Sequence, residues 1–144
     1  MKISIKDSSD IAKMRVAGKL AAQVLEMITE FVKPGVSTGE LDDLCREFIV
    51  NDLKSIPANI GYKGFQHTIC ASLNNVICHG IPSHKKILKD GDILNIDVTV
   101  IKDGWHGDTS KMFIVGKTQP HNARLVQVTQ ECMYLGIKEV KPGA

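Results

Sequence analysis

Two aspartates stand in facing arms of one apolar segment, ILNIDVTVIKDGWHGDTSKMFIV at residues 93–115. Apolar and polar residues alternate on both sides of a central Lys-Asp-Gly, which predicts a β-hairpin. A turn centred on residues 102–103 would place Asp97 directly opposite Asp108, whereas a turn centred on residues 103–104 would make them diagonal neighbours. Either register puts both carboxylates on one face, roughly 4.5–8 Å apart.

Two carboxylates on rigid strands suit a hard divalent cation, which prefers oxygen ligands, and a bridging carboxylate can hold two metals close together. The polar face of an antiparallel sheet can also simply face water, so the hairpin alone leaves both interpretations open. Like charges on neighbouring strands destabilise a sheet unless a cation or a shared proton lies between them. Two aspartates do not complete a metal site, and further ligands would have to come from elsewhere.

A second group of reactive residues lies in TICASLNNVICHGIP at residues 68–82. Asn74-Asn75 predicts a tight turn between two short strands, which would place Cys70 opposite His79 with both side chains on one face. The histidine is open to two interpretations, a hydrogen-bonded structural residue or a neutral imidazole that binds a substrate or relays a proton. A nucleophilic Cys–His pair is disfavoured, because no neighbouring charge or helix N-terminus would lower the thiol pKa.

The elements that position these residues begin with an amphipathic helix. Ser9 or Asp10 is expected to cap its start, and Pro34-Gly35 to stop it. Its apolar residues recur at close to helical period. They are Ile11, Met14, Ala17, Ala21, Val24, Leu25, Ile28 and Val32.

Two further helices are expected, with a polar loop, SIPANIGYKGFQH, before the first strand. Ser37 and Glu40 have the capping-box spacing that predicts the start of the second helix. The last helix, from about residue 122 to 140, runs into Val-Lys-Pro-Gly, as the first helix does 108 residues earlier. This repeat indicates the start of a second, similar structural unit. The buried stripe of the second helix is expected to be Leu41, Leu44, Cys45, Phe48 and Ile49.

Composition bounds the class of the protein. The 144 residues are one domain's worth of chain, and a net charge of +2 without basic–aromatic clusters argues against a nucleic-acid partner. No apolar run approaches the ~18 residues of a membrane span, and the charged start does not match a signal peptide. The cysteines lack CxxC spacing, which argues against a zinc module and fits reduced thiols in a cytoplasm.

GYKGFQHTICASLNNVICHGIP and LKDGDILNIDVTVIKDGWHGDTSKMF together resemble the bacterial type I methionine aminopeptidases. KMRVAGKLAAQVLEMI and VKPGVSTGELD extend this likeness over nearly the whole chain. The resemblance implies an α/β (α+β) architecture, half of a pita-bread (creatinase/aminopeptidase) fold, with antiparallel hairpins covered by helices. Residues 1–144 would form the amino-terminal half of the catalytic domain, truncated after the first helix of the second half.

The resemblance also implies a function and its residues. The full-length enzyme would remove the initiator methionine from nascent proteins with up to two divalent metal ions, Co, Mn, Fe or Zn. Asp97 would chelate one metal and Asp108 would bridge two. His79 would contact the substrate near the scissile bond and help to move a proton. The pocket for the methionine side chain would be lined by Tyr62, Phe65 and Cys70, with His79 nearby.

Three positions depart from the family pattern: Asn59 replaces a usual cysteine, Gln66 a typical proline and Asn75 an acidic residue. The family's remaining ligands, a histidine and two glutamates, have no counterpart in these residues. We therefore expect the 144-residue chain to be inactive alone. The alternative is a non-catalytic half-domain that self-associates, most simply as a homodimer, or binds a partner. Expected partners are peptides beginning with Met, with no nucleic acid and no membrane.

Overall fold

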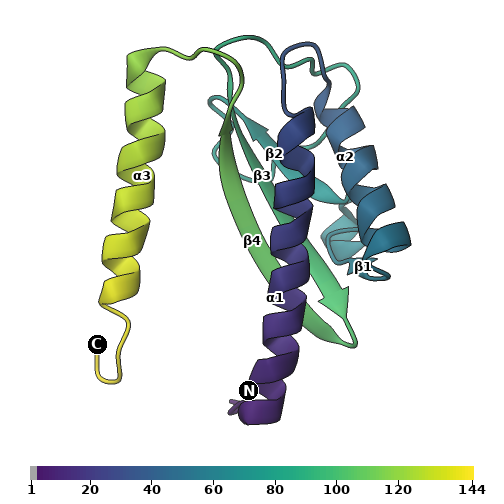
Figure 1. Cartoon of the computed structure of the whole chain (residues 1–144), viewed down its shortest axis with the longest axis vertical. Coiled ribbons are helices and arrows are strands. Elements are labelled where there is room, and N and C mark those ends of the chain that lie inside the picture. Colours follow the sequence, from purple (N-terminus) through teal and green to yellow (C-terminus); the bar gives the residue numbers. More distant parts are fainter. Residues whose placement is uncertain (1–2) are drawn as a thin grey trace.

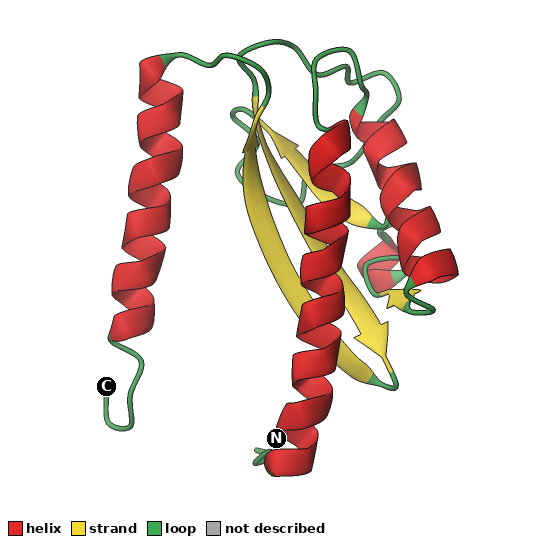
Figure 2. Ribbon diagram, in the orientation of Figure 1, coloured by secondary structure: helices red, strands yellow, loops and turns green. Residues whose placement is uncertain are grey.

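The structure, a computed structural model, describes residues 3–144 as one antiparallel sheet with helices packed against it (Figure 1). This is the α+β arrangement that the sequence predicts. Loops gather mainly at the end of the sheet opposite the β3–β4 turn (Figure 2). The elements are α1 (Ser8–Ile28), α2 (Thr38–Glu47), β1 (Ile56–Pro57), β2 (Ile69–Leu73), β3 (Ile93–Lys102), β4 (Trp105–Ile114) and α3 (Pro120–Lys138), with short helical turns at Thr29–Phe31, Phe48–Asp52 and Tyr62–Gly64.

Strand β3 is the centre of the sheet. Strand β4 pairs with its whole length on one edge, and β2 and β1 pair one after the other along the opposite edge. Every one of these pairs is antiparallel. Within the described part of the chain, the outer edge of β4 pairs with no other strand. The sheet therefore ends in a ten-residue strand whose outward backbone groups have no ladder partner.

The core lies between the sheet and the helices α1 and α2. Ile96, Val98 and Val100 of β3 are fully buried, and the intervening residues are only partly buried. Because successive side chains of a strand point to opposite faces, the residues between them lie on the face away from the helices. This alternation, which the sequence predicts, turns Asp97 and Thr99 toward the side on which the candidate site lies.

Helix α1 begins differently from the prediction. Its cap is Asp7, whose side chain accepts a hydrogen bond from the Asp10 backbone N–H, while the Asp10 carboxylate accepts one from the Asp7 N–H. The predicted cap at Ser9 or Asp10 is wrong, because Asp10 serves instead as the third residue of this capping box. Ile11 and Met14 remain more than 40% exposed, since the first turns of α1 extend past the end of the sheet (Figure 1).

Helix α2 confirms its prediction. Ser37 and Glu40 form the expected capping box. Leu41, Cys45 and Ile49 are fully buried, and the other two stripe residues pack against the same core. Since the predicted stripe is the one that faces the sheet, its periodicity determined how α2 packs.

The segment after β2 corrects the predicted hairpin at Asn74-Asn75. Residues 76–81 form no strand, and β2 pairs with β3 instead. Two backbone bonds link this segment to β2, from the Ala71 N–H to the Gly80 carbonyl at 2.8 Å and from the Val76 N–H to the Leu73 carbonyl at 3.1 Å. His79 has a φ of 53°, a left-handed conformation that a continuous strand ladder cannot accommodate. The expected direct pairing of Cys70 with His79 is therefore wrong.

Helix α3 ends two residues before the predicted boundary and has no buried residue. Figure 1 shows it standing apart from the sheet, beyond β4. Within the described residues, the apolar side chains of α3 are therefore not covered by the rest of the chain. No helix in residues 3–144 combines the length and the apolar character needed to cross a membrane.

Candidate metal and substrate site

The turn of the β3–β4 hairpin determines how the two aspartates meet. Asp103 and Gly104 have φ values of 50° and 82°, the pair of positive values that a two-residue hairpin turn requires. The turn is thus centred on 103–104, the second of the two registers considered. Asp97 is paired with Ser110. Asp108 is paired with Thr99, so the two aspartates are diagonal neighbours on one face.

The two carboxylates interact electrostatically. Burial raises the pKa of Asp97 above its usual value, and the negative charge of Asp108 raises it further. His79 acts in the opposite direction, because a positive imidazole would favour the ionised carboxylate. The environment thus disfavours the charge on Asp97 in the absence of a cation, which is the electrostatic condition expected at a site for a positive ion.

One cavity of about 880 Å³ is lined by all six residues that were predicted to form the site. Its size is within the usual range for small-molecule sites. The wall combines carboxylates and imidazoles with apolar and aromatic surface, so the cavity can hold both a charged group and an apolar side chain. It is lined by Ala58, Asn59, Tyr62, Lys63, Gly64, Phe65, Cys70, His79, Asp97, Thr99, His106 and Asp108.

Cys70 lies beside the carboxylates, since its Cα partner in the β2–β3 ladder is Asp97. Burial, followed by the charge of Asp97, raises the pKa of the Cys70 thiol to about 11. The thiol is therefore protonated at neutral pH, and a protonated thiol is a poor nucleophile. Cys70 consequently forms a small apolar part of the cavity wall.

His79 is positioned by the glycine that follows it. The Gly80 N–H donates to Ser72 Oγ at 3.1 Å, and its carbonyl accepts from the Ala71 N–H. A Cβ atom at Gly80 would lie 2.2 Å from the Ala71 carbonyl oxygen, so only glycine allows this approach. Docking of Gly80 on β2 holds His79 in its left-handed conformation at the cavity, and such strained residues cluster at functional sites.

Several lining residues of the cavity were not predicted from the sequence. Thr99 lies two residues after Asp97 in β3, and His106 lies two residues before Asp108 in β4. Residues two apart in a strand share a face, so the same pattern could have identified both. Lys63 has a φ of 49° in a short helical turn, and no sequence pattern indicated its place at the cavity. Asn59, noted only as a departure from the family, lines the cavity. Neither Gln66 nor Asn75 does so.

The donor set fits a divalent cation in kind but not in number. Asp97 and Asp108 offer the carboxylate oxygens that hard or borderline cations accept. Within residues 3–144, however, no three or more His, Cys, Asp or Glu side chains are grouped so as to hold one metal ion. A cation at this hairpin would therefore have an incomplete set of protein ligands.

Residues 12–144 match Metallopeptidase family M24. Over 143 residues the chain is 64% identical to the methionine aminopeptidase of Salmonella typhimurium and 62% identical to that of Escherichia coli strain K12. Each match covers 99% of this chain and 54% of the relative. The chain thus spans about half the length of the curated relatives that it matches.

Solved structures give the same result. The methionine aminopeptidase of Rickettsia prowazekii matches with a TM-score of 0.96 and 55% identity, and that of Thermotoga maritima with 0.92 and 37%. Each match covers 99% of this chain and 57% of the other. A Xaa-Pro dipeptidase of Bacillus anthracis, 22% identical with a TM-score of 0.83, shares the fold. These matches confirm the expected architecture, half of a pita-bread fold.

Proposed function

Because the chain belongs to metallopeptidase family M24, we propose that it supplies half of the active site of an enzyme that removes the initiator methionine from nascent proteins. The observation that carries this proposal is the convergence of Asp97, Asp108 and His79 on one cavity with apolar and aromatic surface. The identity of 62–64% to methionine aminopeptidases supports the same substrate class. The cytoplasm, where nascent chains are made, is the proposed location.

In this proposal Asp97 would hold one of up to two divalent ions, Co, Mn, Fe or Zn, and Asp108 would be shared between them. Bound there, these ions would supply Lewis-acid chemistry for the scissile carbonyl and for a water molecule. The hairpin contributes rigidity, because both carboxylates project from paired strands rather than from loops. Rigid placement limits the reorganisation that the site needs when the substrate reacts.

His79 binds the peptide near the scissile bond and moves a proton there. A neutral imidazole can donate through one nitrogen and accept through the other, which suits both tasks. Tyr62, Phe65 and Cys70 receive the methionine side chain, since they provide the aromatic and apolar part of the cavity wall. Asn59 adds an amide to that wall, which makes this pocket more polar than a cysteine would.

Catalysis is proposed to require ligands from outside these 144 residues, because the described residues include no group of three metal-binding side chains at one point. The corresponding domain assignment is the amino-terminal half of a methionine aminopeptidase catalytic domain, residues 1–144. The peptide partner is then a protein N-terminus beginning with Met.

A chimera tests this function. Residues 1–144 are joined to the part of the Salmonella typhimurium methionine aminopeptidase that they do not match, and cleavage of a Met-Ala-Ser peptide is measured with Mn(II) or Co(II). We expect metal-dependent cleavage by the chimera and none by the 144-residue chain. Asp108→Asn is expected to abolish cleavage, whereas Asp103→Asn, on the turn of the same hairpin, is the matched control. A folded, metal-loaded but inactive chimera would refute the proposal.

The second candidate function is non-catalytic self-association of the 144-residue chain. Two observations favour it: among residues 3–144 no strand pairs with the outer edge of β4, and no residue of α3 is buried. Strand edges and large apolar surfaces tend to become covered by another chain. The exposed apolar residues of α3 include Leu125, Val128, Met133, Tyr134, Leu135 and Ile137.

A further inference from the structure

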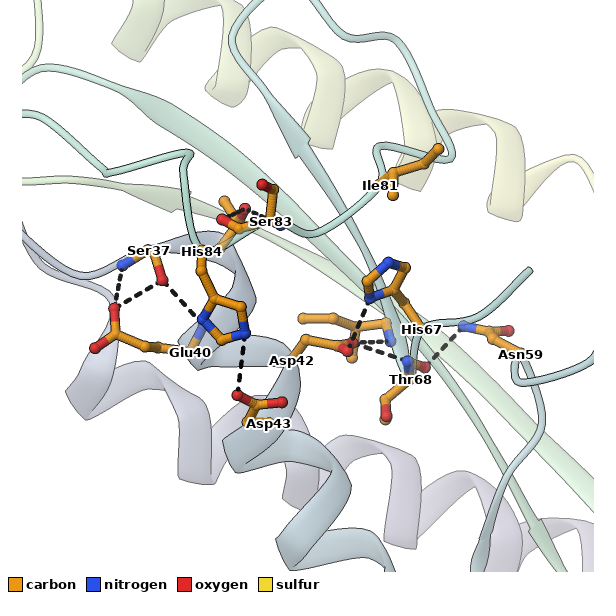
Figure 3. A network of polar contacts seen from close by, with 12 residues as sticks. Ser37, Glu40, Asp42, Asp43, Asn59, His67, Thr68, Ile81, Ser83 and His84 are labelled. Carbon is orange, nitrogen blue, oxygen red and sulfur yellow. Dashed lines mark hydrogen bonds and ion pairs between the residues drawn. The ribbon is translucent and has the colours of Figure 1, made fainter.

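A buried carboxylate on α2, that of Asp42, points toward His67 and Thr68 (Figure 3). Asp42 is 7% exposed. Its Oδ1 atom accepts hydrogen bonds from the backbone N–H groups of Thr68 at 2.8 Å and Ile69 at 2.9 Å. Its Oδ2 atom lies 3.2 Å from Nδ1 of His67. One side chain on a helix therefore binds three successive residues at the start of β2.

The backbone at Thr68 is also bound by a residue that lines the cavity. Asn59, which lines the cavity, donates from Nδ2 to the Thr68 carbonyl at 3.0 Å. The Thr68 hydroxyl is buried and has no hydrogen-bond partner among residues 3–144. Since its own side chain does not anchor it, the position of Thr68 depends on its backbone bonds to Asp42 and Asn59.

These bonds lie next to two residues of the pocket wall. Cys70 follows Ile69 directly in β2 and stands opposite Asp97 in the ladder. Phe65, on the other side, meets the ring of His67 edge to face, with 5.8 Å between ring centroids. A shift at the start of β2 would therefore move the apolar wall relative to the carboxylates.

We propose that Asp42 is a positioning residue that fixes the wall of the side-chain pocket, and with it Cys70, relative to Asp97. This inference rests on the proposed function, because it assigns the wall to the substrate side chain. A carboxylate forms charge-assisted hydrogen bonds, which are shorter and stronger than neutral ones. Two of them on consecutive N–H groups define both the position and the direction of the backbone that enters β2.

The reactivity of the Cys70 thiol reports the position of this wall. In a Cys78→Ser, Cys132→Ser background the other remaining thiol, Cys45, is fully buried and its pKa is raised to about 12. Labelling by methyl methanethiosulfonate at fixed pH, in chelator, then measures access to Cys70. The measurement needs no metal and no turnover, so its outcome is independent of whether the chimera is active.

Asp42→Ala and Asp42→Asn form a matched pair. Both remove the negative charge, and with it the small effect of Asp42 on the Cys70 pKa. Only asparagine retains an oxygen that can accept from the two N–H groups. We expect Asp42→Ala to speed labelling about tenfold, from the lost hydrogen bonds to a charged group. Asp42→Asn is expected to stay close to the parent rate.

Asp92→Ala is the control for a general loss of stability. Its carboxylate also accepts from a backbone N–H, that of Lys89 at 2.8 Å, and from the Asn74 amide at 2.9 Å, but it does not line the cavity. We expect an unchanged labelling rate. If Asp42→Ala lowers the melting temperature without faster labelling, or if Asp92→Ala accelerates labelling equally, the positioning role is overturned.

The parent chain provides a measurement that does not depend on the folding of any variant. Amide hydrogens bonded to a buried carboxylate exchange only when the local structure opens. We expect the Thr68 and Ile69 amides to exchange as slowly as that of Ile96 in the central strand. Rapid exchange of both amides would show that Asp42 does not hold this wall, and would overturn the inference.

Discussion

Asp97 and Asp108 lie on the same face of the β3–β4 hairpin as diagonal neighbours. The pKa of Asp97 is raised by burial and then by the charge of Asp108. The hairpin therefore holds two carboxylates close together, in surroundings that disfavour the negative charge of Asp97 unless a cation is bound. The first three predictions follow from this relationship.

Asp97→Asn or Asp108→Asn is expected to leave the melting temperature of the chain unchanged or slightly higher in chelator at neutral pH. Relief of a cross-strand like-charge pair contributes roughly 0.2–1 kcal/mol. Thermal unfolding followed by circular dichroism is the measurement, with Asp103→Asn on the same hairpin as control. A clear drop in both variants would mean that the carboxylates have structural partners.

The stability contribution of Asp97 is expected to decrease as the pH rises. Its folded-state pKa is above its unfolded value, so the folded chain holds this proton more tightly than the unfolded chain does. The contribution is complete below the unfolded pKa, near 3.8, and is lost as the pH rises through the folded pKa. Subtracting the melting curves of Asp97→Asn from those of the parent across this interval isolates the effect. A melting temperature of the parent that rises relative to that of Asp97→Asn as the pH increases would contradict it.

Divalent metal is expected to bind the 144-residue chain weakly. Two carboxylates leave much of the coordination shell to water, and the described residues bring no third metal-binding side chain to the same point. Isothermal titration calorimetry with Mn(II) or Co(II) measures the affinity. A low-micromolar site that disappears in Asp108→Asn would show that the hairpin pair suffices.

Gly107→Ala is expected to destabilise the fold. A Cβ atom there would lie 2.1 Å from the Ala17 carbonyl oxygen, where α1 crosses β4. Forcing a methyl group into such a contact costs about 1–3 kcal/mol. Gly18→Ala is the matched control, because its Cβ would meet no atom within 4 Å and would stabilise α1 by up to about 1 kcal/mol. Equal denaturant midpoints for the two variants would refute the close contact.

The 144-residue chain is expected to self-associate at micromolar concentration. The unpaired edge of β4 and the exposed apolar residues of α3 are the surfaces that a second copy would cover. Sedimentation velocity over a concentration series is the measurement, with Leu125→Lys and Leu135→Lys as variants that weaken the α3 contact. A compact monomer whose mass is constant with concentration would exclude this candidate function.

Sequence patterns predicted those parts of the fold that depend on interactions between residues close together in the chain. The α2 capping box and its buried stripe follow from residues three and four apart, and both are confirmed. The face shared by Asp97 and Asp108 follows from strand periodicity alone. The register within that face does not, because Lys102, Asp103 and Gly104 allow two turn positions until the backbone angles are known.

Contacts between segments that are distant in the chain could not be predicted from the sequence. Asn74-Asn75 forms the predicted tight turn, closed by a bond from the Val76 N–H to the Leu73 carbonyl, but no strand follows it. The Asn74 side chain binds the Ile93 N–H and the Asp92 carboxylate. Those bonds join it to the start of β3, and β2 then pairs with that strand. The role of Asp42 could not be predicted for a similar reason, because its hydrogen-bond partners at 67–69 lie more than twenty residues away in the chain.

The isolation of α3 also has a consequence for cooperativity. A helix of 19 residues with no buried side chain gains little from tertiary packing, which is the main source of helix stability in proteins. We therefore expect the helix–coil equilibrium of α3 to be largely independent of the unfolding of the sheet with α1 and α2. The chain would then unfold as two thermodynamic units, and a protein that covers α3 would also supply free energy that keeps this helix ordered.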